Sequence, residues 1–223
     1  MTCGHQISNK ECNLSSTDYK HRFLDACLAY GALKFGEFTL KSGRISPYFF
    51  NAGAFNDGAA FDLLGQCYAQ AIEGVQFDGL FGPAYKGIPL GTALAVAMAR
   101  QGRNVPVTFN RKEAKDHGEG GILMGAAPQG RMLLVDDVIT AGTAVREAMS
   151  QLAQVEVTGL VVALDRQERG LGATSAIQEL RAEGLDVRTI VTLDDVLEFA
   201  RATQSPDQIH AIELYREEYG VTD

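Results

Sequence analysis

Short apolar runs alternate with amphipathic segments along most of the chain. The apolar runs are continuous rather than alternating, which is typical of strands that are buried on both faces. They cover residues 77–81, 105–109, 132–135, 160–164 and 187–193. Helical periodicity lies before and between them, at residues 59–71, 91–98, 144–152 and 173–183 and again near the C-terminus. This alternation predicts an α/β fold with a mostly parallel central sheet flanked by helices.

The N-terminal part of the chain breaks this alternation. Its first residues are polar and aperiodic, and helical spacing begins only after a cap at Thr17 or Asp18. Two β-prone runs then flank the turn-rich Lys41–Arg44, which predicts a hairpin. We therefore expect a disordered tail at 1–16 and a single domain at 17–223, with a small helix–hairpin hood at about 17–58.

Composition narrows the possible partners. The chain has 223 residues and a net charge of −8, and this acidity argues against general binding to nucleic acid or anionic membranes. No apolar run reaches the roughly 18 residues of a membrane span, and the N-terminus lacks a signal core. The four cysteines show no metal spacing, and Cys27 and Cys67 fall on apolar helix faces, as expected of reduced thiols. We expect a cytoplasmic protein.

The segment Arg131–Met149 carries the most specific chemistry. It begins as an apolar strand and ends as an amphipathic helix, with Asp136 and Asp137 at the turn between them. Backbone N–H groups at such a helix start favour an anion, so Ile139–Ala144 is interpreted as a cradle for a phosphate monoester. Ionised carboxylates accept hydrogen bonds from hydroxyl groups, which suits a sugar phosphate. A metal-binding pair and a helix cap remain alternatives.

The stretch "LLVDDVITAGT" resembles the phosphoribosyl pyrophosphate (PRPP) motif of type I phosphoribosyltransferases. In that family the motif holds the ribose 5-phosphate and the 2- and 3-hydroxyls. Five further stretches resemble orotate phosphoribosyltransferases: "FTLKSGRISPYFFN", "GPAYKGIPL", "FNRKEAKDHGEGG", "LDRQERG" and "YREEYGV". The resemblance runs from about Leu33 to the C-terminus. It implies transfer of the phosphoribosyl group from PRPP to orotate in pyrimidine synthesis, giving orotidine 5-phosphate and diphosphate.

The resemblance also implies roles for individual residues. The expected PRPP contacts are Lys41, Tyr85, Lys86, Arg111, Lys112, Lys115, His117, Asp136, Asp137, Val138, Ile139, Thr140, Ala141, Gly142, Thr143 and Ala144. The expected orotate contacts are Phe49, Phe50, Thr140 and Arg166. The expected catalytic residues are Lys86, Lys115, Asp136 and Asp137. The cofactor is expected to be Mg²⁺ held mainly by diphosphate and water, with no direct protein ligand predicted.

The resemblance further implies a homodimer with shared active sites, in which Lys41, Arg111 and Lys115 reach the neighbouring subunit's PRPP. The stretch Arg111–Gly121 shows no periodicity, and its only apolar side chain is that of Ala114. This predicts a mobile lid.

Physical chemistry supports some of these roles directly. The guanidinium of Arg166 matches a carboxylate such as that of orotate. Neighbours in a strand face opposite ways, so one of Phe49 and Phe50 is expected in the core. Two rival functions remain, a phosphoribosyltransferase for another base and a non-enzymatic PRPP-binding regulator. Arg166 disfavours the first, since neutral bases need no carboxylate partner, and the basic lid disfavours the second.

Overall fold

A six-stranded sheet forms the centre of the protein. We describe a computed structural model that covers residues 16–40, 42–115, 121–139 and 141–221. The strands are β3 (Gly79–Gly82), β4 (Val107–Lys115), β5 (Gly121–Gly125), β6 (Arg131–Val138), β7 (Glu156–Asp165) and β8 (Asp186–Thr192). Their order is β5-β4-β3-β6-β7-β8, and only β5 runs antiparallel to its neighbour. The predicted α/β class with a mostly parallel sheet is confirmed.

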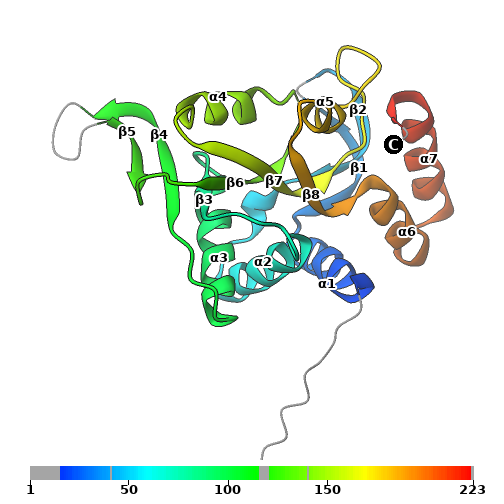
Figure 1. The fold of residues 1–223 in the computed structure, drawn as a ribbon. Helices are drawn as coiled ribbons and strands as arrows, with labels where there is room; N and C mark the ends of the chain where they lie inside the picture. Colours follow the sequence, from blue (N-terminus) through cyan, green and yellow to red (C-terminus); the bar gives the residue numbers. More distant parts are fainter. Residues whose placement is uncertain (1–15, 41, 116–120, 140, 222–223) are drawn as a thin grey trace, which may run out of the picture.

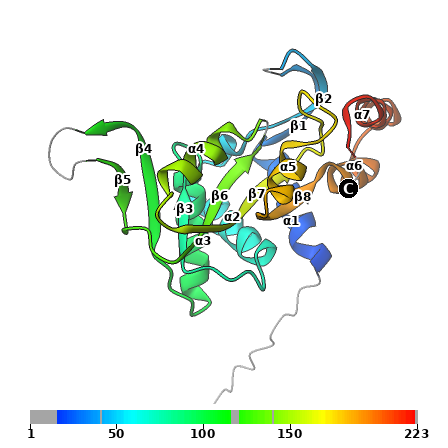
Figure 2. The same cartoon turned by 45° about the horizontal axis from the view of Figure 1, so that its top comes forward.

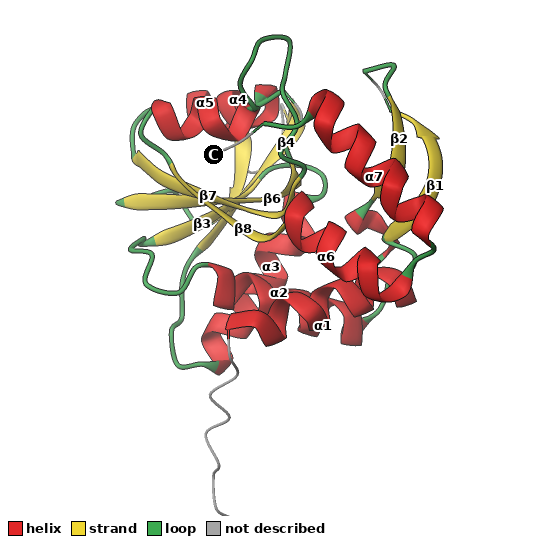
Figure 3. Ribbon diagram, turned by 90° about the vertical axis from the view of Figure 1, so that its right-hand side faces the viewer, coloured by secondary structure: helices red, strands yellow, loops and turns green. Residues whose placement is uncertain are grey.

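Helices cover both faces of this sheet (Figure 1). One layer holds α1 (Ser16–Ala29), α2 (Gly58–Ala71) and α3 (Gly87–Arg100), and the other holds α4 (Thr143–Gln151) and α5 (Ala176–Ala182). Figure 3 shows the two layers above and below the strands, with α6 (Leu193–Thr203) and α7 (Pro206–Tyr219) towards the viewer. None of the helices in the described ranges is long and apolar enough to cross a membrane.

The central strand β6 shows why the apolar runs are continuous. Leu133 and Val135 belong to the core that contains side chains of α1, α2 and α3. Met132 and Leu134 belong to a second core with side chains of α4 and α5. All four are at most 1% exposed. Because successive side chains of a strand point to opposite faces, a sheet that is covered twice requires apolar residues at every position.

The predicted hairpin is confirmed as a separate two-stranded sheet. Strands β1 (Leu33–Thr39) and β2 (Ile45–Phe50) are antiparallel, and the one-turn 3-10 helix η1 (Ala52–Ala54) follows them. Figure 2 shows the hairpin beside α7. There, Nε2 of Gln208 donates a hydrogen bond to the carbonyl of Pro47 at 2.7 Å. The hairpin is therefore held to the C-terminal helix.

Several boundaries differ from the sequence predictions. Helix α1 begins at Ser16, before the expected caps, while α5 begins at Ala176, after a capping box of Ser175 and Gln178. The aperiodic stretch predicted from Arg111 onward is regular at its start, because Arg111–Lys115 continues β4 and Lys115 pairs with Gly121 of the unpredicted strand β5. That this stretch moves as a lid stays a prediction. Charged residues are tolerated there because only one strand lies beyond β4, so this side of the sheet is its edge. Residues 116–120 lie outside the described part, as do residues 1–15.

Cys27 and Cys67 are buried free thiols, as predicted. Burial raises the pKa of Cys67 to about 12. Such thiols are inert at neutral pH because the reactive thiolate is not formed.

Candidate active site

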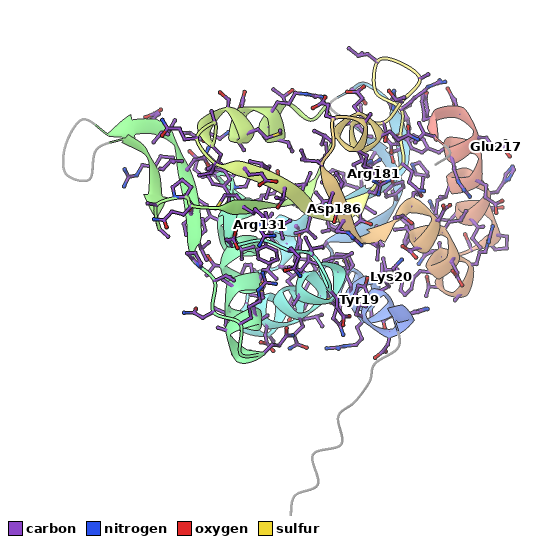
Figure 4. All side chains as sticks on the ribbon, viewed as in Figure 1. Tyr19, Lys20, Arg131, Arg181, Asp186 and Glu217 are labelled. Atoms are coloured by element: carbon purple, nitrogen blue, oxygen red, sulfur yellow. The ribbon has the colours of Figure 1, made fainter. Side chains whose placement is uncertain are left out.

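The predicted site residues gather at the carboxyl edge of the parallel strands. Val138, at the end of β6, pairs with Leu164 of β7, so Arg166 lies just beyond the same edge. Figure 4 labels Arg131 and Asp186, which begin β6 and β8 at the opposite edge. Ligand sites of open α/β sheets lie at the carboxyl edge. The turns that leave β3, β6 and β7 therefore frame one candidate site.

The turn after β3 sits close against β6 because of two glycines. A Cβ on Gly82 would lie 2.2 Å from the carbonyl oxygen of Gly87, and a Cβ on Gly87 would lie 2.7 Å from that of Val135. Only residues without a side chain allow this approach. Lys86 consequently reaches the next turn, where its Nζ lies 2.5 Å from Oδ2 of Asp137. This ion pair joins the two turns that were predicted to hold PRPP.

The two aspartates at the end of β6 lie in different surroundings. Asp137 is 7% exposed and paired with Lys86, whereas Oδ1 of Asp136 accepts the backbone N–H of Asp137 at 2.8 Å. The hydroxyl of Tyr68, from α2, donates to the carbonyl of Asp136 at 2.8 Å and so ties the turn to this helix. Burial, and next the charge of Asp137, raise the pKa of Asp136 to about 7. A cationic or hydrogen-bonding ligand would favour its ionised form.

The turn that follows suits an anion. Gly142 is the N-cap of α4 with φ of 70°, a left-handed conformation that favours glycine. Having no side chain, Gly142 leaves the first N–H groups of α4, at Thr143 and Ala144, without a side-chain cap. Val138 and Ile139 pack their side chains against the two cores, so they offer only backbone groups to a ligand. Thr140 lies outside the described residues.

Arg166 is held by the hood. Its Nε and Nη2 lie 2.8 Å and 2.7 Å from Oε1 of Glu168, and Nη2 donates to Oγ of Ser46 at 3.1 Å. The guanidinium carbon also lies 4.3 Å from the ring centroid of Tyr48. Arg166 is 8% exposed, so its charge is balanced inside the protein by Glu168. A ligand carboxylate at this point would have to share the guanidinium with Glu168.

Phe49 and Phe50 divide as the strand pattern predicts. Phe50 is 8% exposed and lies in the core, with its ring centroid 6.2 Å from that of Phe23. Phe49 is 38% exposed, and its ring centroid lies 5.5 Å from that of Phe38. Side chains alternate along β2, which places the Phe49 ring on the face opposite Tyr48 and hence opposite Arg166.

The basic side chains lie on β4 and the neighbouring turn. Arg111 and Lys112 belong to β4, and Nζ of Lys112 lies 5.3 Å from the ring centroid of Tyr85, which is 70% exposed. The peptide bond between Ala84 and Tyr85 is cis. Lys115 ends the same strand, but its side chain, like Lys41 and His117, is outside the described part.

Sequence patterns did not single out three residues that hold this site together. Tyr68 resembles an ordinary member of an apolar helix face, and its hydroxyl bond to Asp136 depends on the fold. Asn110 and Glu168 stand inside stretches that resemble the transferases, yet neither has a spacing that marks a role. Such residues are recognised from their contacts with distant segments of the chain. These contacts are seen in the folded structure and not in a single sequence.

Comparison with known proteins identifies the family. Residues 55–174 match the family described as "Phosphoribosyl transferase domain". Orotate phosphoribosyltransferases of Thioalkalivibrio sulfidiphilus and Cronobacter sakazakii are 59% and 55% identical, each over 91% of this chain and 99% of theirs. The crystal structure of the Francisella tularensis orotate phosphoribosyltransferase has a TM-score of 0.81 at 39% identity, covering 90% of this chain and all of that one. The chain belongs to the orotate phosphoribosyltransferase family, pentosyltransferases of pyrimidine biosynthesis that transfer the phosphoribosyl group of PRPP to orotate.

Proposed function

We propose that the transfer takes place between the turn that carries Lys86 and the Asp136–Asp137 turn. The observation that carries this proposal is the 2.5 Å ion pair of Lys86 with Asp137, which places a cation for diphosphate beside carboxylates for a sugar diol. The direct test is loss of orotate absorbance when PRPP and Mg²⁺ are added, with release of one diphosphate per orotate. Consumption of another base in place of orotate would refute the proposed substrate.

Each part of PRPP has a counterpart in the proposed site. The 5-phosphate lies against the backbone N–H groups of Ala141–Ala144, as at other helix N-termini. The ribose hydroxyls donate to the carboxylates of Asp136 and Asp137. The diphosphate lies at the turn after β3 and meets basic side chains. These are Lys86, Arg111, Lys112, Lys115 and His117, with Tyr85 and Lys41 as the remaining predicted contacts.

The reaction is a displacement at ribose C1. The bond from C1 to the diphosphate oxygen breaks, and its electron pair leaves with diphosphate. A bond forms from C1 to the ring nitrogen of orotate, and the proton of that nitrogen is transferred to water. Positive charge develops on the sugar ring, where Asp136 and Asp137 stabilise it. Lys86 and Lys115 stabilise the departing negative charge. No covalent enzyme intermediate is needed, since positioning and charge stabilisation supply the catalysis.

Mg²⁺ fits these residues as a companion of the substrate. Among the described residues, no three His, Cys, Asp or Glu side chains gather in a way that could hold a metal ion. Protein-bound Mg²⁺ typically uses one or two carboxylates together with substrate phosphates and water. When bound, Mg²⁺ would neutralise charge on the diphosphate and assist its departure. The Asp136 and Asp137 carboxylates supply hard oxygen donors next to that position.

Orotate is proposed to lie between the hood and the end of β7. Arg166 would share its guanidinium between Glu168 and the orotate carboxylate, a group that adenine, uracil and other neutral bases lack. Phe49 and Phe50 remain predicted contacts by their place in β2, although the Phe50 ring lies in the core and the Phe49 ring lies on the face opposite Arg166. Thr140 remains a predicted contact by its hydroxyl. Transfer to a neutral base provides no role for Arg166 as a carboxylate partner. PRPP binding without catalysis provides no role for the basic side chains around the leaving diphosphate.

We further propose a cytoplasmic homodimer in which Lys41, together with Arg111 and Lys115 of a basic arm, serves the neighbouring subunit's PRPP. The net charge of −8 supports the absence of nucleic-acid and membrane partners. The arm consists of β4 beyond Asn110, β5 and the residues between them. The two strands of the arm lie at the edge of the sheet, at the left in Figure 1 and away from the hood. In a two-fold dimer each site would then take one part from each chain.

Mixed dimers should reveal this sharing. A Lys115→Ala chain and an Asp136→Ala, Asp137→Ala chain are each expected to be inactive. After equal mixing, unfolding and refolding, half of the dimers are mixed, and each mixed dimer regains one intact site. About one quarter of wild-type activity should therefore return. No recovery, in a preparation with proven mixed dimers, would show that the arm serves its own subunit.

A second mixture leaves less activity with shared sites than with separate sites. A chain with all three substitutions is refolded with an equal amount of wild type. If sites are shared, both sites of every mixed dimer are defective, and about one quarter of full activity remains. If each subunit uses its own arm, mixed dimers keep one site, and about one half remains. The two mixtures together separate sharing from poor refolding.

A further inference from the structure

Asn110 connects three elements that meet beside the diphosphate position. Its Oδ1 accepts the backbone N–H of Ala84 at 2.6 Å, in the turn after β3. Its Nδ2 donates to Oε1 of Gln151 at 3.0 Å, in the last turn of α4. Asn110 itself lies in β4, directly before Arg111 and Lys112. One half-buried amide therefore links the turn, the basic arm and the helix whose first residues form the phosphate cradle.

The orientation of this amide follows from the backbone. A main-chain N–H can only donate, so the atom of Asn110 that faces Ala84 must be its oxygen. The NH₂ group then faces Gln151, which must present its own oxygen. Both bonds are consistent with one placement of each amide. A carboxamide at position 110 is the side chain that can accept on one side and donate on the other.

The turn needs this support because the sheet no longer provides it. β3 ends at Gly82, which pairs with Phe109, so Ala84 lies beyond the strand ladder. The next two residues are exposed, Tyr85 at 70% and Lys86 with 48% of its side chain. Close contact of Gly82 with Gly87 closes the base of the turn, and the ion pair of Lys86 with Asp137 holds its end. The bond from Ala84 to Asn110 fixes the tip of the turn relative to β4.

We propose that Asn110 is a positioning residue for diphosphate. It holds the turn of residues 83–86 so that Lys86 and the backbone of that turn face the diphosphate alongside Lys112, whose Nζ lies 5.3 Å from the ring centroid of Tyr85. Asn110 does not itself contact the reacting atoms in this account. The inference rests on the proposed diphosphate position, and it predicts a defect that is specific for PRPP and diphosphate.

The test compares Asn110→Ala with Gln151→Ala. Loss of a neutral hydrogen bond corresponds to roughly a threefold to tenfold change in an equilibrium constant. Asn110→Ala should raise the PRPP KM and weaken the calorimetric affinity for magnesium diphosphate by about that factor. The orotate KM should stay within about twofold, a margin narrower than the loss of one such bond. Gln151→Ala removes only the distal bond, so its effect should be smaller but in the same direction.

Asn110→Asp adds a readout that a general loss of stability would not produce. The carboxylate can still accept the N–H of Ala84, and Gln151 can rotate its amide to donate. The variant adds a negative charge near the proposed position of the diphosphate. Salt screens the repulsion between the two. The affinity for magnesium diphosphate is compared with that of the wild type at each salt concentration. The deficit of Asn110→Asp should shrink as salt rises, whereas the deficit of Asn110→Ala should stay constant. A deficit of the Asp variant that does not change with salt would overturn the proposal.

The outcomes also distinguish this inference from the proposed function. An inactive wild-type protein would refute the function itself. An active wild type together with normal diphosphate affinity in Asn110→Ala would refute only the role of Asn110. Equal loss for orotate and PRPP, in step with a lower melting temperature, would show that Asn110 is merely structural. If the Ala variant does not fold, the salt dependence of the Asp variant decides the question.

Discussion

The double variant Asp136→Asn, Asp137→Asn is expected to lose at least about 99% of its turnover. Hydrogen bonds to charged acceptors contribute roughly 1.5–3 kcal/mol each, so two of them correspond to a hundredfold or more. Asparagine keeps the size of both side chains but removes the negative charge that stabilises the developing cation on the ribose. Turnover should be measured at saturating PRPP and orotate, so that weaker binding does not contribute. Near-normal turnover would contradict the assigned role of the two carboxylates.

The fold of this variant should change much less than its activity. Burial raises the pKa of Asp136, so the folded chain keeps a proton that the unfolded chain releases near pH 4. Stability from this group therefore falls as pH rises from about 4 to about 7. The Asp136→Asn change abolishes this fall in stability with rising pH, because asparagine does not titrate. The Asp137→Asn change lowers stability, because it removes the ion pair with Lys86. Asp186→Asn is the matched control and should retain full turnover. Asp186 begins β8, at the amino ends of the strands, and is paired with Arg188.

Arg166→Ala is expected to raise the orotate KM tenfold or more while the PRPP KM stays within about twofold. The charge-assisted bonds to a ligand carboxylate are worth roughly 1.5–3 kcal/mol, which sets this magnitude. The variant should also be less stable, because Glu168 is left buried without its closest partner and Tyr48 loses its stacked guanidinium. Steady-state kinetics well below the melting temperature separate the two effects. An equal rise of both KM values would assign Arg166 a structural role.

Arg44→Ala provides the matched control. Arg44 approaches the same carboxylate, with its Nη1 3.8 Å from Oε2 of Glu168, and its guanidinium carbon lies 4.7 Å from the ring centroid of Tyr219. It also donates to the carbonyl of Gly170 at 3.2 Å. Its removal should lower the melting temperature and leave the orotate KM nearly unchanged. A large rise in the orotate KM would show that disturbing the hood alone accounts for the effect.

The sequence predicted the buried strands well because their pattern depends on local apolar runs. In β6, four successive apolar residues, Met132–Val135, face two cores in alternation, and Leu160–Ala163 of β7 do the same. The Asp136–Asp137 turn was found because its residue types and spacing are contiguous. The Lys86 turn was found from its resemblance alone, and its approach to Asp137 requires the two glycines that allow the backbones to touch.

Features that depend on contacts between distant segments were missed. The continuation of β4 through Arg111–Lys115 has a charged sequence with low strand propensity, and its pairing with β5 decides its structure. The sequence predicted that the guanidinium of Arg166 matches the carboxylate of orotate. It did not predict the bond to Ser46, because 120 residues separate the two. Asn110 acts through two polar atoms whose partners are 26 and 41 residues away, and Tyr68 acts through a hydroxyl whose partner is 68 residues away. Periodicity contains no information about such bonds.

The most direct test is a crystal structure of the protein with PRPP, Mg²⁺ and an unreactive analogue of orotate. We expect the ribose hydroxyls within hydrogen-bond distance of Asp136 and Asp137, and the 5-phosphate on the N–H groups of Ala141–Ala144. The diphosphate should lie at the turn that carries Lys86, and the analogue's carboxylate at Arg166. A ribose 5-phosphate bound away from the Asp136–Asp137 turn, or an analogue whose carboxylate does not reach Arg166, would contradict the account.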